Sequence, residues 1–150
     1  MEYPLPNFHF SVEWGPDRRT GFSRVHNLKF INIPIETRKG DSRVTRPQKQ
    51  PSRQEFENVV LERPVIKGDN DFFEWWKGTS LFNENDSPGS VFRTSITIKL
   101  LNDEHEPVLV WQLRDAFPVS LTYSDLDALG KTVLYERLEV AFEGVNVIND

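Results

Sequence analysis

The stretch "VFRTSITIKLL", residues 91–101, has the clearest alternation of apolar and polar residues in the chain. One face carries Phe92, Thr94, Ile96, Ile98 and Leu100, and the other carries Arg93, Ser95, Thr97 and Lys99. A period of two residues is typical of a strand that buries one face and exposes the other. The stretch therefore predicts a half-buried β-strand.

Similar short patterns recur along the rest of the chain. "FHFSVEW" (8–14) alternates strictly, and further strands are predicted within 22–26, 28–38, 57–66, 108–117, 119–124 and 132–145. Pro34 cannot donate to a ladder, so its strand is expected at an edge or bulged. About seven or eight short strands separated by turns favour a mainly β fold, an antiparallel β-barrel or sandwich.

One helix is predicted in "GDNDFFEWWKG", residues 68–78. Asp69 or Asn70 is the expected N-cap, and Gly78 is the expected stop signal, which leaves about two turns. Phe72, Phe73 and Trp76 are expected to face inward, with Trp75 at the edge of that face. The helix then packs on the barrel and closes one open end; an aromatic ligand box is the less favoured alternative.

The composition fits one domain over residues 1–150. The chain has no cysteine and a formal charge of −5, and its first ten residues lack the features of a secretory signal. No stretch approaches the 18 or so apolar residues that mark a transmembrane helix. We expect synthesis in the cytoplasm, no membrane anchor and no sequence-specific binding of nucleic acid.

A basic arm is predicted at about 36–56. Residues 38–56 show no apolar periodicity, and they are read as a long loop or protruding arm. Its bases are Arg38, Lys39, Arg43, Arg46, Lys49 and Arg53, against the single acid Asp41 between Arg38 and Arg53. The arm is either a solvated loop or a segment that docks on an acidic surface, such as another copy of the chain.

The chain shows no convincing catalytic, cofactor or metal motif. "GKT" (130–132) resembles the end of a phosphate-binding loop, but Asp125 stands where that loop needs glycine. "GDS" (40–42) resembles a serine-esterase motif, but the Asp and His that would pair with the serine are not found in the expected pattern. His105 lies in an acidic cluster, "NDEHE" (102–106), which reads better as a solvated turn than as an acid/base or metal site. His9, His26 and His105 are far apart in sequence. No enzyme activity, cofactor or metal site is therefore expected.

Several segments together resemble the tail tube proteins of contractile phage tails and of extracellular contractile injection systems. In chain order they are "YPLPNFHFSVEWG", "GFSRV", "KGDNDFFEWW", "ITIKLLNDEHEPVLVW", "RDAFP" and "ERLEVAFEGV". The resemblance covers nearly the whole chain apart from residues 36–56 and 82–91. It implies a barrel with one flanking helix that assembles into a hexameric ring, with rings stacking into a rigid tube inside a sheath.

The resemblance also implies partners. These are further copies of the chain, a second tube paralogue, the sheath, the spike and the baseplate, with protein cargo as a candidate occupant of the lumen. Together these proteins would form a phage-tail-like particle that is either released or membrane-anchored. In the stacked tube of that particle, the six bases of the arm would contact the adjacent ring. Arg93, Ser95, Thr97 and Lys99 are a candidate lumen face, or simply a solvated sheet face.

Three departures from the family pattern leave the exact role open. The family usually has glycine at the position of Pro64, the arm is unusually basic, and "NENDSPGS" (83–90) lengthens a loop. A main tube subunit is slightly favoured over a baseplate-proximal ring that joins tube to spike. An alternative of another class is a monomeric β-barrel that binds a small apolar ligand, with Trp14, Trp75, Trp76 and Trp111 around its cavity.

Overall fold

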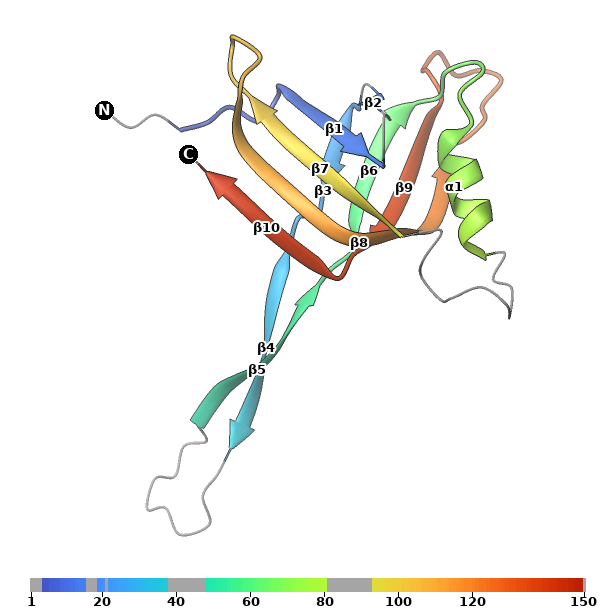
Figure 1. The fold of residues 1–150 in the computed structure, drawn as a ribbon. Helices are drawn as coiled ribbons and strands as arrows, with labels where there is room; N and C mark the ends of the chain where they lie inside the picture. The colour runs from blue at the N-terminus through green and yellow to red at the C-terminus, as the bar shows by residue number, and fades with distance from the viewer. Residues whose placement is uncertain (1–3, 16–18, 21, 38–47, 81–92, 150) are drawn as a thin grey trace.

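The computed structural model describes residues 4–15, 19–20, 22–37, 48–80 and 93–149. They form β1 (Phe10–Trp14), β2 (Arg19–Thr20), β3 (Arg24–His26), β4 (Phe30–Thr37), β5 (Gln48–Phe56), β6 (Val59–Pro64), α1 (Asp71–Ser80), β7 (Thr94–Leu101), β8 (Pro107–Tyr123), β9 (Tyr135–Ala141) and β10 (Gly144–Asn149). Figure 1 shows a curved sheet with α1 at one side and a long hairpin that projects from it.

Eight strands form one antiparallel sheet in the order β2-β1-β7-β8-β9-β6-β3, with β10 also paired to β8. The end strands β2 and β3 do not pair with each other within the described part of the chain. The expected mainly β architecture with antiparallel strands and one short helix is therefore confirmed, but the described strands do not close a barrel.

Strand β8 links the two halves of this sheet. Its first half pairs with β7 and β10, and its second half pairs with β9 from Phe117 onward, with a register shift between Pro118 and Ser120. Asp115 adopts a positive φ of 54° near the bend. The sequence predicts two strands within 108–124 and one within 132–145, but the first two are one bent strand and the last is divided into β9 and β10. A bulge shifts the apolar–polar alternation by one residue. The alternation alone therefore does not show whether a strand continues through the bulge or ends there.

The core lies on the concave side of the sheet and combines side chains from both halves. Its members are Val12, Trp14, Val59, Leu61, Phe72, Ile96, Ile98, Leu113, Ala116, Leu138, Val140 and Phe142. On β7 the buried positions are Ile96, Ile98 and Leu100, as the alternation predicts. Phe8, within the predicted first strand 8–14, is 76% exposed, and β1 begins only at Phe10.

Helix α1 is longer than predicted and uses a different inward face. It runs through Gly78 to Ser80. Phe72 is fully buried, and Trp75 stacks on Trp14 with ring centroids 5.0 Å apart, whereas Trp76 is 36% exposed. Residues three and four positions after Phe72 are equally placed to share its face, and only the tilt of the helix on the sheet selects Trp75. The expected inward position of Trp76 was therefore wrong.

Residues 38–56, predicted as a long loop or protruding arm, include strand β5, which the sequence does not predict. Gln48–Phe56 pairs with β4 to form a separate two-stranded ribbon, which projects from the body of the molecule (Figure 1). Its register shifts between Ile33 and Pro34, so the predicted irregularity at Pro34 is confirmed. Every residue of β5 except Phe56 is exposed. A strand with solvent on both faces needs no apolar alternation, which explains why β5 has no periodic pattern in the sequence.

Candidate assembly surfaces

The first candidate surface is the arm, defined here as β4, β5 and the segment between them. Phe30 and Phe56 pack at its root against Phe142 of the core, and the Phe56 and Phe142 rings are stacked 5.2 Å apart. Beyond this root the ribbon is held mainly by its own ladder and by the Ser52 hydroxyl, which donates to the Ile33 carbonyl at 2.8 Å. The described part of the arm is thus a largely solvent-exposed ribbon anchored at one end.

Two of the six arm bases lie within the described residues. Lys49 and Arg53 are on β5, and Arg53 forms an ion pair with Glu55 at 2.8 Å. Arg38, Lys39, Arg43 and Arg46 lie outside the described residues. The described part of the ribbon carries both signs of charge, so any basic excess of the arm comes from the segment between β4 and β5.

The second candidate surface is the convex face of β1, β7, β8 and β10, called the polar face below. Ser95, Thr97 and Lys99 lie on it, opposite the buried Ile96 and Ile98. Lys99 Nζ contacts the Glu13 carboxylate of β1 at 3.1 Å, and Asn146 of β10 donates to Gln112 of β8 at 3.4 Å. Arg93, just before β7, pairs with Glu143 at 2.5 Å and lies over the Phe117 ring. The charges of this face are therefore largely neutralised by neighbours on adjacent strands.

Gly144 serves the polar face by leaving room for Arg114. The two residues are register partners, and a Cβ placed on Gly144 would lie 2.5 Å from Arg114 Nη2. Contacts that short do not occur between real atoms, so a side chain here would displace the guanidinium. Glycine at 144 allows Arg114 to lie flat over the strand.

The third candidate surface is the set of open strand edges. Within the described residues β10 pairs only with β8, β3 pairs only with β6, and β2 covers just two residues of β1. An open edge exposes a row of backbone donors and acceptors, which invites pairing with another chain. Among the described strands, β10, β3 and the part of β1 that β2 leaves uncovered are therefore available for inter-subunit pairing, as are the outer edges of β4 and β5.

A buried charge cluster holds α1 on the sheet, and sequence reasoning missed it. Arg63 of β6 is 1% exposed; its Nε donates to Glu136 of β9 at 2.6 Å, and its Nη2 donates to Asp69 at 3.1 Å. The guanidinium also lies over the Phe72 ring, 3.9 Å from its centroid. The same Asp69 oxygen accepts from the Asp71 N–H, and the Asn70 carbonyl accepts the first helical bond from Glu74, so both predicted N-cap candidates contribute to the start of the helix.

A signal for this cluster was present in the alternation. Arg63 shares the phase of Val59 and Leu61 on β6, and Glu136 shares the phase of Leu138 and Val140 on β9. Opposite charges on the apolar phases of two strands predict a buried pair once the strands are known to be neighbours. The missing information was the pairing of β6 with β9.

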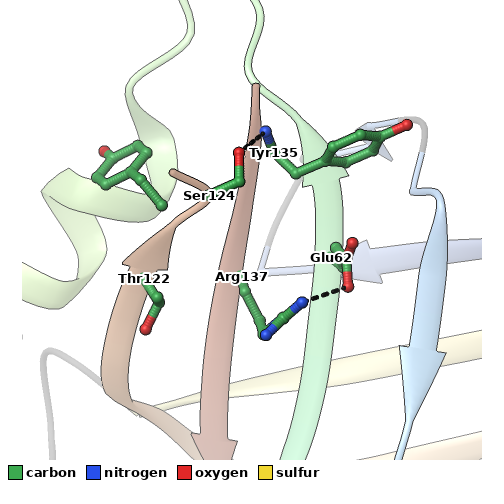
Figure 2. A pocket seen from close by; sticks show the side chains of 6 residues that line it. Glu62, Thr122, Ser124, Tyr135 and Arg137 are labelled. Atoms are coloured by element: carbon green, nitrogen blue, oxygen red, sulfur yellow. Dashed lines mark hydrogen bonds and ion pairs between the residues drawn. The ribbon is translucent and has the colours of Figure 1, made fainter. Parts of the chain in front are cut away.

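A small hollow lies on the opposite face of the same strands (Figure 2). It is lined by Glu62, Thr122, Tyr123, Ser124, Tyr135 and Arg137, with a volume of about 100 Å³. Arg137 Nη2 contacts Glu62 at 3.4 Å across it, and the Tyr135 N–H donates to the Ser124 hydroxyl at 2.9 Å. Ligand sites usually occupy about 300–1,000 Å³, so this hollow is too small for a typical organic ligand.

The tryptophans do not form the ligand cavity of the alternative reading. Trp14 is buried and stacked on Trp75, and Trp111 packs against the core. Trp76 instead lies near Phe73 on the exposed side of the helix, 6.1 Å between ring centroids.

In the described ranges no helix is long and apolar enough to cross a membrane.

Comparison with known proteins gives a consistent result. The family model for the T4-like virus tail tube protein gp19 matches residues 6–146. No curated protein matches the chain. The tube structure of an extracellular contractile injection system, described as the PVC sheath-tube complex in the extended state, is 27% identical with a TM-score of 0.82, covering 99% of this chain and 94% of the other.

Two further structures extend this comparison. A chain of the anti-feeding prophage tube-terminating cap is 26% identical with a TM-score of 0.84, covering 100% of this chain and 94% of that one. Hcp1 from Flavobacterium johnsoniae is 14% identical with a TM-score of 0.57, covering 95% and 97%, and it shares the fold. Because the family model covers nearly the whole chain, this protein belongs to the T4-like virus tail tube protein family and is a tube protein of the contractile injection type.

Proposed function

We propose that the chain is the main tube subunit of a contractile injection system, and that its copies form hexameric rings that stack head to tail. The observation that carries this is the construction of the half-sheet β1-β7-β8-β10, which has one apolar face, one polar face and an open edge at β10. Such a unit is incomplete alone. Copies that pair edge to edge form a closed wall without free strands.

In that arrangement the polar face lines the lumen. Ser95, Thr97 and Lys99 would then face the channel, together with Arg93 at its margin. Lys99 and Glu13 are already paired within one subunit, as are Arg93 and Glu143. A hydrophilic wall whose charges are largely paired within each subunit offers passing protein cargo few strong sites at which to bind, which favours movement along the tube.

The arm is proposed to connect successive rings. It projects from one end of the molecule, whereas the β7–β8 and β8–β9 turns lie at the opposite end (Figure 1). Those turns carry five exposed acids, Asp103, Glu104, Glu106, Asp125 and Asp127, and the β8–β9 turn also exposes Leu126 and Leu129 at 88% and 91%. Head-to-tail stacking brings a basic arm toward an acidic rim, and complementary charge favours the correct register.

The remaining partners follow from the tube role. Two of the relatives described above occur in a sheath–tube complex and in a tube-terminating cap. For this chain we infer a surrounding sheath, a baseplate and spike at one end, and a second tube paralogue between them. The protein is made in the cytoplasm and then becomes part of a phage-tail-like particle. The family and its neighbours are structural tube proteins, and no enzyme activity is proposed.

The test is electron microscopy of the purified chain, alone and with the products of neighbouring genes. Long tubes formed by the chain alone support the main tube subunit. Single rings that lengthen only on a baseplate or a second tube protein favour the baseplate-proximal ring. A chain that forms no ring under any of these conditions overturns the proposal.

A further inference from the structure

The β7–β8 turn brings together two histidines that are 96 residues apart in sequence. His105 Nδ1 lies 3.1 Å from His9 Nε2, and the rings meet edge to face with centroids 4.7 Å apart. One of these two nitrogens carries the proton that the other accepts. Their separation in sequence had argued against a shared site, but the pairing of β1 with β7 places them side by side.

Both histidines are held in place by backbone hydrogen bonds. The Leu101 N–H donates to the His9 carbonyl at 2.8 Å, which fixes the residue before β1 against the end of β7. In the turn, Asn102 Oδ1 accepts the N–H groups of Glu104 and Glu106, each at 2.9 Å. His105 itself adopts a positive φ of 64°, uncommon for a residue other than glycine. The turn is thus built to direct the His105 ring toward His9.

The distance between the two nitrogens fits adjacent ligands of one metal ion. Bonds from imidazole nitrogen to Zn²⁺ are about 2.0–2.1 Å, which places two ligands about 3.3 Å apart in tetrahedral and about 2.9 Å apart in octahedral geometry. The observed 3.1 Å lies between these values. If the shared proton moves to the other nitrogen of the same ring and both rings rotate, the two facing lone pairs can point at one metal ion.

We propose that His9 and His105 form a two-histidine site for a divalent transition-metal ion of the kind that prefers imidazole, such as Cu²⁺, Ni²⁺ or Zn²⁺. No third His, Cys, Asp or Glu joins them in a metal-binding group among the described residues, so water fills the remaining positions. The exposed carboxylates of Asp103, Glu104 and Glu106 in the same turn raise the local concentration of cations. A bound ion ties the segment before β1 to the β7–β8 turn.

The site is tested by titrating the tag-free chain with CuCl₂, NiCl₂ or ZnCl₂ and measuring affinity by calorimetry. We expect 1:1 binding that is strongest for Cu²⁺. His9→Gln and His105→Gln should each weaken binding at least about tenfold, while His26→Gln on β3 is the matched control that leaves it unchanged. Electron paramagnetic resonance of the Cu²⁺ complex should report two nitrogen ligands, falling to one in either variant.

Two results would overturn the site. The first is wild-type affinity in His9→Gln or His105→Gln. The second is loss of binding only when Asp103, Glu104 and Glu106 are all replaced by their amides, which would assign the ion to the carboxylates. Circular dichroism of each variant checks that the fold is retained. The titration needs no ring or tube, so its outcome is independent of the proposed assembly.

Discussion

Replacement of Glu136 by alanine should strongly destabilise the chain, because it leaves the Arg63 charge buried without its main partner. The two side chains are 2% and 4% exposed and are joined at 2.6 Å. Removal of one partner of such a buried pair costs about 3–5 kcal/mol. Asp69 remains at 3.1 Å from Arg63 but is 21% exposed on its side chain and compensates only partly. We therefore expect a loss near the lower end, about 3 kcal/mol.

The structure supplies a matched control on the same two strands. Arg137 and Glu62 are the next residues along β9 and β6, on the opposite face, where they form a pair at 3.4 Å with side chains 54% and 16% exposed. An exposed pair contributes about 0–1 kcal/mol. Arg137→Ala should therefore lower stability by less than about 1 kcal/mol, although it removes the same kind of interaction from the same ladder.

A double replacement distinguishes the contribution of the two charges to stability from the contribution of the volume that the two side chains fill. Arg63→Met with Glu136→Leu removes both charges and retains apolar volume, and it should be much less damaging than Glu136→Ala alone. The assay is urea unfolding followed by circular dichroism, at concentrations where the midpoint does not depend on protein concentration. With a slope of about 2 kcal/mol per molar urea, the Glu136→Ala midpoint falls by about 1.5 M. Equal losses in Glu136→Ala and Arg137→Ala would refute the reasoning.

Three other predictions concern the helix, the sheet edge and the arm. Trp75→Ala should cost about 3 kcal/mol in urea unfolding because Trp75 stacks on Trp14, whereas Trp76→Ala should cost less than half as much. Val147→Lys, on the open edge strand β10, should reduce ring formation in electron micrographs without changing the circular dichroism spectrum, because lysine at a strand edge opposes pairing. Reversal of Arg43, Arg46 and Lys49 to Glu should shorten tubes while rings still form; tubes of normal length in this variant, or an equal effect of Arg137→Glu, would count against docking through the arm.

The sequence predicts those parts of the fold in which one face of an element is buried. The alternation on β7, the turn signals and the aromatic helix were all readable because burial imposes a period on them. Strand β5 was missed because it is exposed on both faces, and the continuity of β8 was missed because the register shift between Pro118 and Ser120 changes the phase of the alternation. None of these features leaves a periodic trace.

Sites that depend on strand neighbours were the hardest to predict. The pairs Arg63–Glu136 and His9–His105 join residues far apart in sequence, and each becomes visible only when the ladder order is known. The resemblance to tail tube proteins supplied the family but not these contacts. The polar side of β7 could be read from the sequence, although its pairing with Glu13 could not.

Three phenylalanines at the root of the arm mark the boundary between the body, whose residues are constrained by packing in the core, and the ribbon, whose residues are not. Phe30, Phe56 and Phe142 join the ribbon to the body, and beyond them the ribbon gives no side chain to the core. Substitutions past the root should therefore leave folding of the body nearly untouched. The arm of another tube protein could therefore be inserted between Phe30 and Phe56. The same body would then fold with different arms, each of which would contact a different adjacent ring.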